Sequence, residues 1–287
     1  MFRESAEGGP FAANEGIDRE FEARRRAALI TLGVLVAVGA VAVGILALVG
    51  DGESTRLTGE DADRVVGTFG VIGLFLAVVF TGQVLLTGVA EEKNSRVVEV
   101  VLGTMRPRHL LAGKVIALGL IGFGEVLVTI ATILVAGELT GSVEFPAATT
   151  SAVVSMLGWF VLGYAFFSTL YGAAGAMVRR HTDASNAAAP INLAMSVGYV
   201  VGVISAAVGE SPVLRIASLV PPTAPFTMPV RIIWGTAPVG EIVGSIVLVA
   251  ASTYGLIRLA GRVYAGALLR TGKVSWREAW RAADELS

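Results

Sequence analysis

The chain has 287 residues, of which 54% are hydrophobic and 16% are charged, and its mean hydropathy is +0.72. A soluble domain carries about 25% charged residues, so the soluble class is excluded, and recurring apolar runs of about 20 residues indicate a membrane protein. The formal net charge of −1 points to neither nucleic acid nor an acidic surface as partner. The lack of cysteine excludes disulfides and thiol chemistry, and the presence of only two histidines argues against a metal site.

In chain order, the sequence predicts a cytoplasmic tail over residues 1–26, a six-helix membrane domain over 27–259 and a cytoplasmic amphipathic tail over 260–287. Each span is near the length of about 20 residues that crosses about 30 Å of hydrocarbon. The expected spans are Ala27–Gly50, Val65–Val89, Val115–Gly137, Ala152–Val178, Ala187–Val208 and Pro238–Ile257. The predicted fold class is therefore an all-α polytopic membrane protein.

The distribution of Lys and Arg predicts how these helices are oriented. With both termini in the cytoplasm, 18 of the 22 Lys and Arg residues fall on the inner side and four on the outer side. Inner loops carry the excess of basic residues in membrane proteins. The predicted location is the plasma (inner) membrane, and the loop between spans two and three is predicted to lie in the cytoplasm.

That loop, Gly88–Lys114, is charged and has a helical pattern: GVAEEKNSRVVEVVLGTMRPRHLLAGK. On a helix, Val98, Leu102 and Met105 share one stripe, and Glu92 and Arg96 lie on nearly the opposite face. A helix resting on lipid headgroups and a helix docking on a partner protein both fit this pattern. The candidate partner-contact residues are Glu91, Glu92, Lys93, Arg96, Glu99 and Arg106.

Two polar residues inside the predicted spans are candidates for lining a substrate path. Glu125 falls near the middle of the third span, where a charge costs at least about 2.5–3.5 kcal/mol. It must face a bundle interior, a cavity or a partner, or be protonated, so a cation or path site and a packed, hydrogen-bonded glutamic acid are equal alternatives. Asn192 follows Pro190 in the fifth span, and an ordinary kink near the cytoplasmic entry is the favoured alternative there.

The last two segments of the chain are also distinctive. Gly209–Ala237 is broken by five prolines yet apolar, which predicts short re-entrant or interfacial helices on the outer side between spans five and six. In the C-terminal tail, Trp276 and Trp280 are neighbours on one face of a short amphipathic helix that is expected to lie on the inner leaflet.

The chain encodes no nucleotide site of its own. A P-loop requires GxxxxGK followed by Ser or Thr, and the GK pairs at Gly113-Lys114 and Gly272-Lys273 are both followed by Val. We therefore expect no catalytic residues, no cofactor and no metal in this chain, so energy has to come from a partner or a gradient.

The loop sequence given above resembles the cytoplasmic loop of ABC-2 type permeases in the sodium-efflux permease-like branch. Three further stretches are similar to that family in the same order: GYAFFSTLYGAAGAMVRRHTDASNAAAPINL (Gly163–Leu193), SLVPPTAPFTMPVRI (Ser218–Ile232) and LAGRVYAGALLRTGKVSWREAWR (Leu259–Arg281). The chain departs from the branch in one respect. Members often carry a large extracytoplasmic domain after the first span, and here only Asp51–Arg64 stands in that place.

The resemblance implies a membrane permease subunit of an ATP-driven ABC exporter. Two permeases, identical or different, would pair with two copies of an ATPase subunit that binds ATP and Mg²⁺. The loop would then be a coupling helix on that ATPase. The alternative is an ATPase-independent proton- or cation-coupled carrier or channel centred on Glu125, although the two halves of the chain show no internal repeat. An intramembrane enzyme is poorly supported, because Glu125 is the only acid deep in a predicted span.

Overall fold

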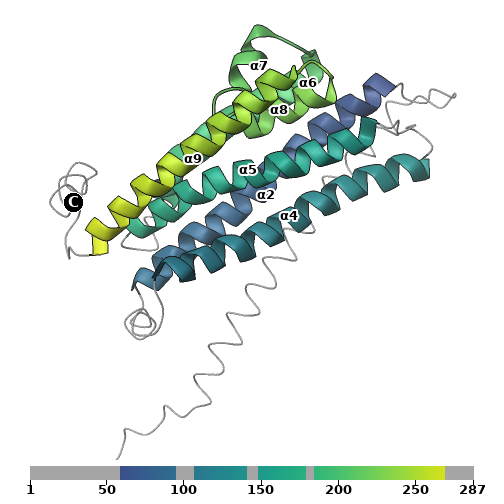
Figure 1. Ribbon diagram of the computed structural model, residues 1–287. Helices are drawn as coiled ribbons and strands as arrows, with labels where there is room; N and C mark the ends of the chain where they lie inside the picture. The colour runs from purple at the N-terminus through teal and green to yellow at the C-terminus, as the bar shows by residue number, and fades with distance from the viewer. Residues whose placement is uncertain (1–58, 95–106, 141–147, 179–183, 269–287) are drawn as a thin grey trace, which may run out of the picture.

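A computed structural model describes residues 59–94, 107–140, 148–178 and 184–268, and this part of the chain is helical without any strand (Figure 1). The helices are α2 (Gly59–Asn94), α4 (Pro107–Thr140), α5 (Ala148–Met177), α6 (Ala184–Val208), α7 (Pro212–Ala217), α8 (Ala224–Ile233) and α9 (Val239–Leu268). The all-α prediction is confirmed for these residues.

Five of these helices are long and apolar enough to cross a membrane. Their candidate spans are Gly67–Glu91, Leu111–Val135, Ala152–Met177, Asn186–Ala206 and Val239–Leu259, which agree with the second to sixth predicted spans. The first predicted span, Ala27–Gly50, lies outside the described residues, as do the whole predicted N-terminal tail and residues 269–287 of the predicted C-terminal tail. The first predicted span and the orientation of the termini remain predictions.

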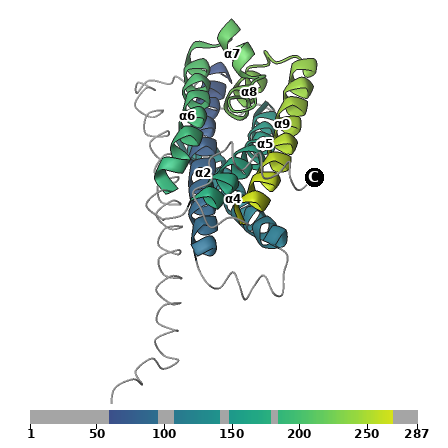
Figure 2. The same ribbon diagram turned by 90° about the vertical axis from the view of Figure 1, so that its left-hand side faces the viewer.

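The helices form a bundle in which α2 and α5 are central, with α2 packing against α4, α5, α6 and α8 (Figures 1 and 2). Helix α9 packs mainly on α5. We call the end of the bundle where α2 ends and α4 begins the loop end, and the opposite end, which carries α7 and α8, the cap end. Pro107 is the first residue of α4, a position where proline is favoured because its missing N–H has no helical partner.

Close approach between helices depends on glycine at several crossings. A Cβ on Gly175 of α5 would lie 2.6 Å from the backbone oxygen of Leu86 in α2. A Cβ on Gly82 of α2 would overlap the ring of Tyr171 in α5. Lipid offers no hydrophobic gain for helix association, so membrane helices associate through such close van der Waals packing. Some of the 35 glycines in the sequence therefore allow helices to approach closely at these crossings.

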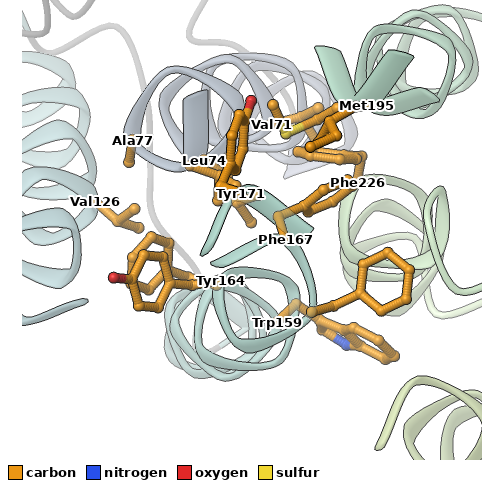
Figure 3. Packing of buried hydrophobic residues seen from close by; sticks show 14 of the residues in the cluster. Val71, Leu74, Ala77, Val126, Trp159, Tyr164, Phe167, Tyr171, Met195 and Phe226 are labelled. Carbon is orange, nitrogen blue, oxygen red and sulfur yellow. The ribbon is translucent and has the colours of Figure 1, made fainter. Parts of the chain in front are cut away.

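The core lies between α2, α4, α5, α6 and α8 and is rich in aromatic side chains (Figure 3). Phe75 and Tyr199 stack with ring centroids 4.4 Å apart, and Phe226 packs near Phe75 and Phe167 at 6.1 and 6.0 Å. Stacked and edge-on aromatic pairs stabilise beyond the area that they bury. These contacts join α8 to α2 and α5, and α2 to α6.

The proline-broken segment between α6 and α9 folds as two short helices, as predicted, but α8 does not lie on the surface. Every residue from Ala224 to Arg231 is buried. Two glycines of α6 make room for it, because a Cβ on Gly198 would lie 2.9 Å from the Cα of Thr223 and one on Gly202 would lie 2.6 Å from the backbone oxygen of Phe226. Figure 2 shows α8 enclosed between α6 and α9.

The outward faces of the bundle are apolar. Leu120 of α4, Leu193 of α6 and Val239 of α9 are each more than two-thirds exposed. In a soluble protein, a surface of this kind would be a liability. On five helices of membrane-spanning length, it is the surface expected to face lipid.

Candidate functional site

The predicted coupling residues are at the loop end, and the structure describes them only in part. Glu91 is exposed, and Glu92 and Lys93 belong to the final turn of α2. Arg96, Glu99 and Arg106 fall within residues 95–106, outside the described part. The proposed docking face therefore stays a prediction. It begins in the final turn of α2, and α2 packs inside the bundle.

Helices α2 and α4 are joined at the loop end by a polar contact. Lys114 Nζ donates a hydrogen bond to the carbonyl oxygen of Gly88 at 3.0 Å. A Cβ on Gly88 would lie 3.0 Å from the same Nζ, so the ammonium occupies the space that a side chain would take. A lysine at the end of a membrane span commonly anchors the helix at the lipid interface, whereas here the Lys114 ammonium contacts α2.

Glu125 lies in α4 on the face that packs against α2 and α5. One turn before it, a Cβ on Gly122 would lie 3.0 Å from Thr81 in α2 and 2.8 Å from Phe160 in α5. One turn after it, Thr129 sits against Gly73 of α2. The helical position of Glu125 between these contacts explains why it is only 6% exposed. Among the surroundings that the sequence left open for Glu125, the structure shows the interior of the bundle.

The carboxyl group of Glu125 lacks one of its expected partners. Its Oε2 is buried and accepts no hydrogen bond from any residue that the structure describes. A buried polar atom without a partner is costly and calls for an explanation, such as a proton, an ion or a ligand. The Thr129 hydroxyl donates its hydrogen bond to the Glu125 backbone oxygen at 2.9 Å, so it is not a partner of the carboxyl group.

Asn192 belongs to a separate polar cluster. Its Oδ1 accepts hydrogen bonds from the hydroxyl of Tyr171 at 2.5 Å and from Gln83 Nε2 at 3.3 Å. The cluster therefore joins α6 to α5 and α2, and no hydrogen bond in the described part of the chain links it to Glu125. Sequence reasoning missed Gln83, although an amide in an otherwise apolar helix is a signal that such a contact exists.

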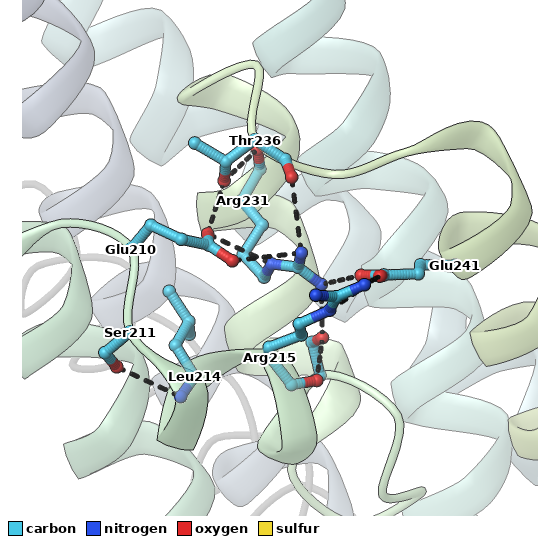
Figure 4. Close-up of polar contacts among 8 residues, drawn as sticks. Glu210, Ser211, Leu214, Arg215, Arg231, Thr236 and Glu241 are labelled. Carbon is cyan, nitrogen blue, oxygen red and sulfur yellow. Dashed lines mark hydrogen bonds and ion pairs between the residues drawn. The ribbon is translucent and has the colours of Figure 1, made fainter.

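The most extensive polar cluster lies at the cap end and was not predicted (Figure 4). Arg231 of α8 is 1% exposed, and its guanidinium group contacts Glu210, Ser218, Thr236 and Glu241. Nε is 3.2 Å from Glu210 Oε2, Nη1 is 2.9 Å from Ser218 Oγ and 2.6 Å from Glu241 Oε2, and Nη2 is 3.1 Å from Glu210 Oε1 and 3.2 Å from the Thr236 carbonyl oxygen.

Three of these contacts are hydrogen bonds, one from each guanidinium nitrogen, and the contacts with Glu210 Oε1 and Glu241 Oε2 are ion pairs. Arg215 of α7 also pairs with Glu241, with Nε 2.7 Å from Oε1, but its side chain is 61% exposed. Glu210 follows α6 and Glu241 begins α9, so the cluster ties α7 and α8 to the ends of both long helices. Two acids and two bases make it neutral, which permits burial beside an apolar core.

None of these clusters has the composition of a metal centre. Within the described ranges, no group of three His, Cys, Asp or Glu side chains is placed to hold a metal ion. The chemistry that the clusters support is hydrogen bonding and charge pairing between helices, together with one carboxyl group that has an unpartnered oxygen. Such groups position helices and contact passing polar solutes.

Comparison with known proteins places this architecture in a family. Residues 51–261 match the family described as ABC-2 family transporter protein. The chain is 24% identical over 256 residues to the uncharacterized protein YhaP of Bacillus subtilis, an alignment that covers 82% of this chain and 60% of YhaP.

A second relative is the uncharacterized protein MJ1024 of Methanocaldococcus jannaschii, 24% identical over 179 residues, covering 62% of this chain and 43% of that protein. The chain thus spans about half the length of these relatives. No solved structure matches it. Because the family match extends over most of the chain and all five candidate spans, the chain belongs to the ABC-2 family of transporter proteins.

Proposed function

We propose that this protein is the membrane permease subunit of an ATP-driven exporter, with ATP hydrolysed by a separate ATPase subunit. The observation that carries the proposal is the family match over residues 51–261. In the assembly that we propose, two permeases pair with two ATPase subunits in the plasma membrane, and both permease termini lie in the cytoplasm. ATP and Mg²⁺ bind to the ATPase, and this chain contributes no catalytic residue.

The arrangement of the helices supports a coupling role for residues 95–106. This segment connects α2 to α4, and α2 packs directly against α4, α5, α6 and α8. A displacement at its ends therefore reaches α5, α6 and α8 through direct packing. We propose that Glu91, Glu92, Lys93, Arg96, Glu99 and Arg106 form the ATPase contact.

We further propose that Glu125 and Asn192 contribute to the substrate path. The support for Glu125 is its buried Oε2 without a partner. The support for Asn192 is its place in a polar cluster that three helices share. The sodium-efflux permease-like branch is the proposed subfamily, and sodium ions, drugs, peptides and lipid-like compounds are the substrate classes to be compared.

A charge reversal tests the coupling role. The double variant Glu92→Arg with Arg96→Glu keeps the charge total and the helical spacing while it inverts the proposed docking face. We expect the variant to be inserted and folded like the wild type, but to lose co-purification with the ATPase or to lose transport. Normal export together with normal ATPase binding would rule out this face as the coupling element.

A further inference from the structure

The contact between Lys114 and Gly88 joins the two helices that lead into and out of the proposed coupling segment. Gly88 lies near the end of α2, Lys114 lies near the start of α4, and residues 95–106 connect these two helix ends. The Lys114 ammonium reaches the Gly88 carbonyl oxygen at 3.0 Å. This is therefore a bridge across the base of the segment that we propose to dock on the ATPase.

The bridge has favourable electrostatics. A hydrogen bond whose donor is an ammonium group is shorter and stronger than one between two neutral groups. A half-buried ammonium is also less screened by water than an exposed one. The absence of a side chain at Gly88 allows this approach, because a Cβ there would lie 3.0 Å from Nζ.

The α2 side of the bridge is rigidly seated. Gly175 of α5 packs against the backbone oxygen of Leu86 and against the side chain of Val89, at 2.6 and 3.0 Å from an ideal Cβ. Helix α5 therefore holds the turn of α2 that contains Gly88, and Lys114 attaches α4 to that same turn.

We propose that Lys114 is a positioning residue for coupling, which holds the ends of α2 and α4 together so that force on the connecting segment moves both helices as one unit. This inference rests on the proposed function. Further along the pair, the Thr81–Gly122 and Gly73–Thr129 crossings lie on either side of Glu125. Joint movement of α2 and α4 keeps these crossings in register and carries the displacement to Glu125.

The experiment measures the separation of the two helix ends in the complex with its ATPase. The chain has no cysteine, so spin labels attach only where Val84→Cys and Ala112→Cys place them, at exposed positions of α2 and α4. Distance distributions are recorded by electron paramagnetic resonance without nucleotide and with the ATPase trapped by ADP and vanadate. The ATP hydrolysis rate of each complex is measured in parallel.

Two variants remove the bridge by different means. Lys114→Met removes the donor, and Gly88→Leu keeps the charge but fills the space of the ammonium. A hydrogen bond from a charged group is strong enough that its loss raises the population of separated helix ends about tenfold. We expect both variants to broaden the distance distribution, most of all in the trapped state, and Lys114→Arg to restore it.

The matched control is Arg258→Met. It also removes one cation, but Arg258 contacts Tyr254 of its own helix, with its guanidinium carbon 4.9 Å from the ring centroid. This variant is expected to match the wild type in both measurements. Unchanged distances in Lys114→Met and Gly88→Leu would overturn the bridge, and broadened distances with an unchanged response to trapping and an unchanged ATP hydrolysis rate would overturn its coupling role.

Failure of the proposed function gives a different result. If no ATPase co-purifies with the wild-type chain, the proposed function fails, while the distances between labels in the isolated chain still report on the bridge. The two conclusions are therefore separable within one set of samples.

Discussion

Replacing Arg231 by Met should destabilise the protein far more than replacing Arg215 by Met. Both arginines pair with Glu241, yet their side chains differ in exposure, at 1% for Arg231 and 61% for Arg215. Methionine retains most of the aliphatic volume, so the comparison isolates the charge and the hydrogen bonds. The two variants are matched in residue type, partner and location.

The expected magnitude follows from what Arg231 leaves behind. Removing one partner of a buried ion pair costs about 3–5 kcal/mol, because the remaining charge stays desolvated. Glu210 is 36% exposed and can be rehydrated, which places the loss for Arg231→Met at the lower end, about 3 kcal/mol. An exposed pair contributes about 0–1 kcal/mol, so Arg215→Met should cost less than that.

The assay is thermal unfolding in detergent, followed by tryptophan fluorescence or by retention of the monodisperse peak. A loss of about 3 kcal/mol lowers the Tm by about 6–12 °C in a protein of this size. Arg215→Met should lower it by no more than about a third of that shift. Equal shifts for the two variants, or a stable Arg231→Met, would show that the cap-end cluster does not hold α7 and α8.

Three further predictions concern the bundle. Gly175→Ala should lower the free energy of unfolding by about 1–3 kcal/mol, because the added methyl group overpacks against a backbone oxygen of α2. Gly158→Ala in the same helix places its methyl group in open space and should leave the Tm unchanged in thermal unfolding. Glu125→Gln should assemble normally and alter the pH dependence or substrate preference of transport; weakened association of permeases with unchanged transport would instead assign Glu125 to packing. Gly67→Cys with Ala206→Cys should form a disulfide under mild oxidation, because the two Cβ atoms lie 3.9 Å apart, within the range that disulfides require; free thiols on a denaturing gel would contradict the contact of α2 with α6.

Hydropathy predicted the spans well because crossing a membrane is a property of a local run of residues. The five described spans follow directly from apolar length. The burial of Glu125 was likewise predictable, because the cost of a charge in hydrocarbon leaves few places for it. In each case the physical constraint acts on residues that are adjacent in the chain.

The polar clusters could not be predicted in the same way. Gln83 and Asn192 are 109 residues apart in the chain. Arg231 forms hydrogen bonds and ion pairs with residues on both sides of it in the sequence, which the turns at the cap end bring together. Such pairs depend on how helices pack, which composition does not encode. The prolines between α6 and α9 predicted short helices. They did not predict that α8 lies inside the bundle, because the space for α8 is provided by glycines of α6, a different helix.

The central claim is that this chain works as the membrane half of an ATP-driven exporter. The most direct measurement is purification of the chain in its membrane complex, identification of the bound subunits by mass spectrometry, and reconstitution of that complex in proteoliposomes with sodium ions as the first transport probe. The account predicts a bound ATPase subunit and a flux that requires ATP. A chain that purifies without an ATPase and conducts sodium ions or protons unaided would contradict it.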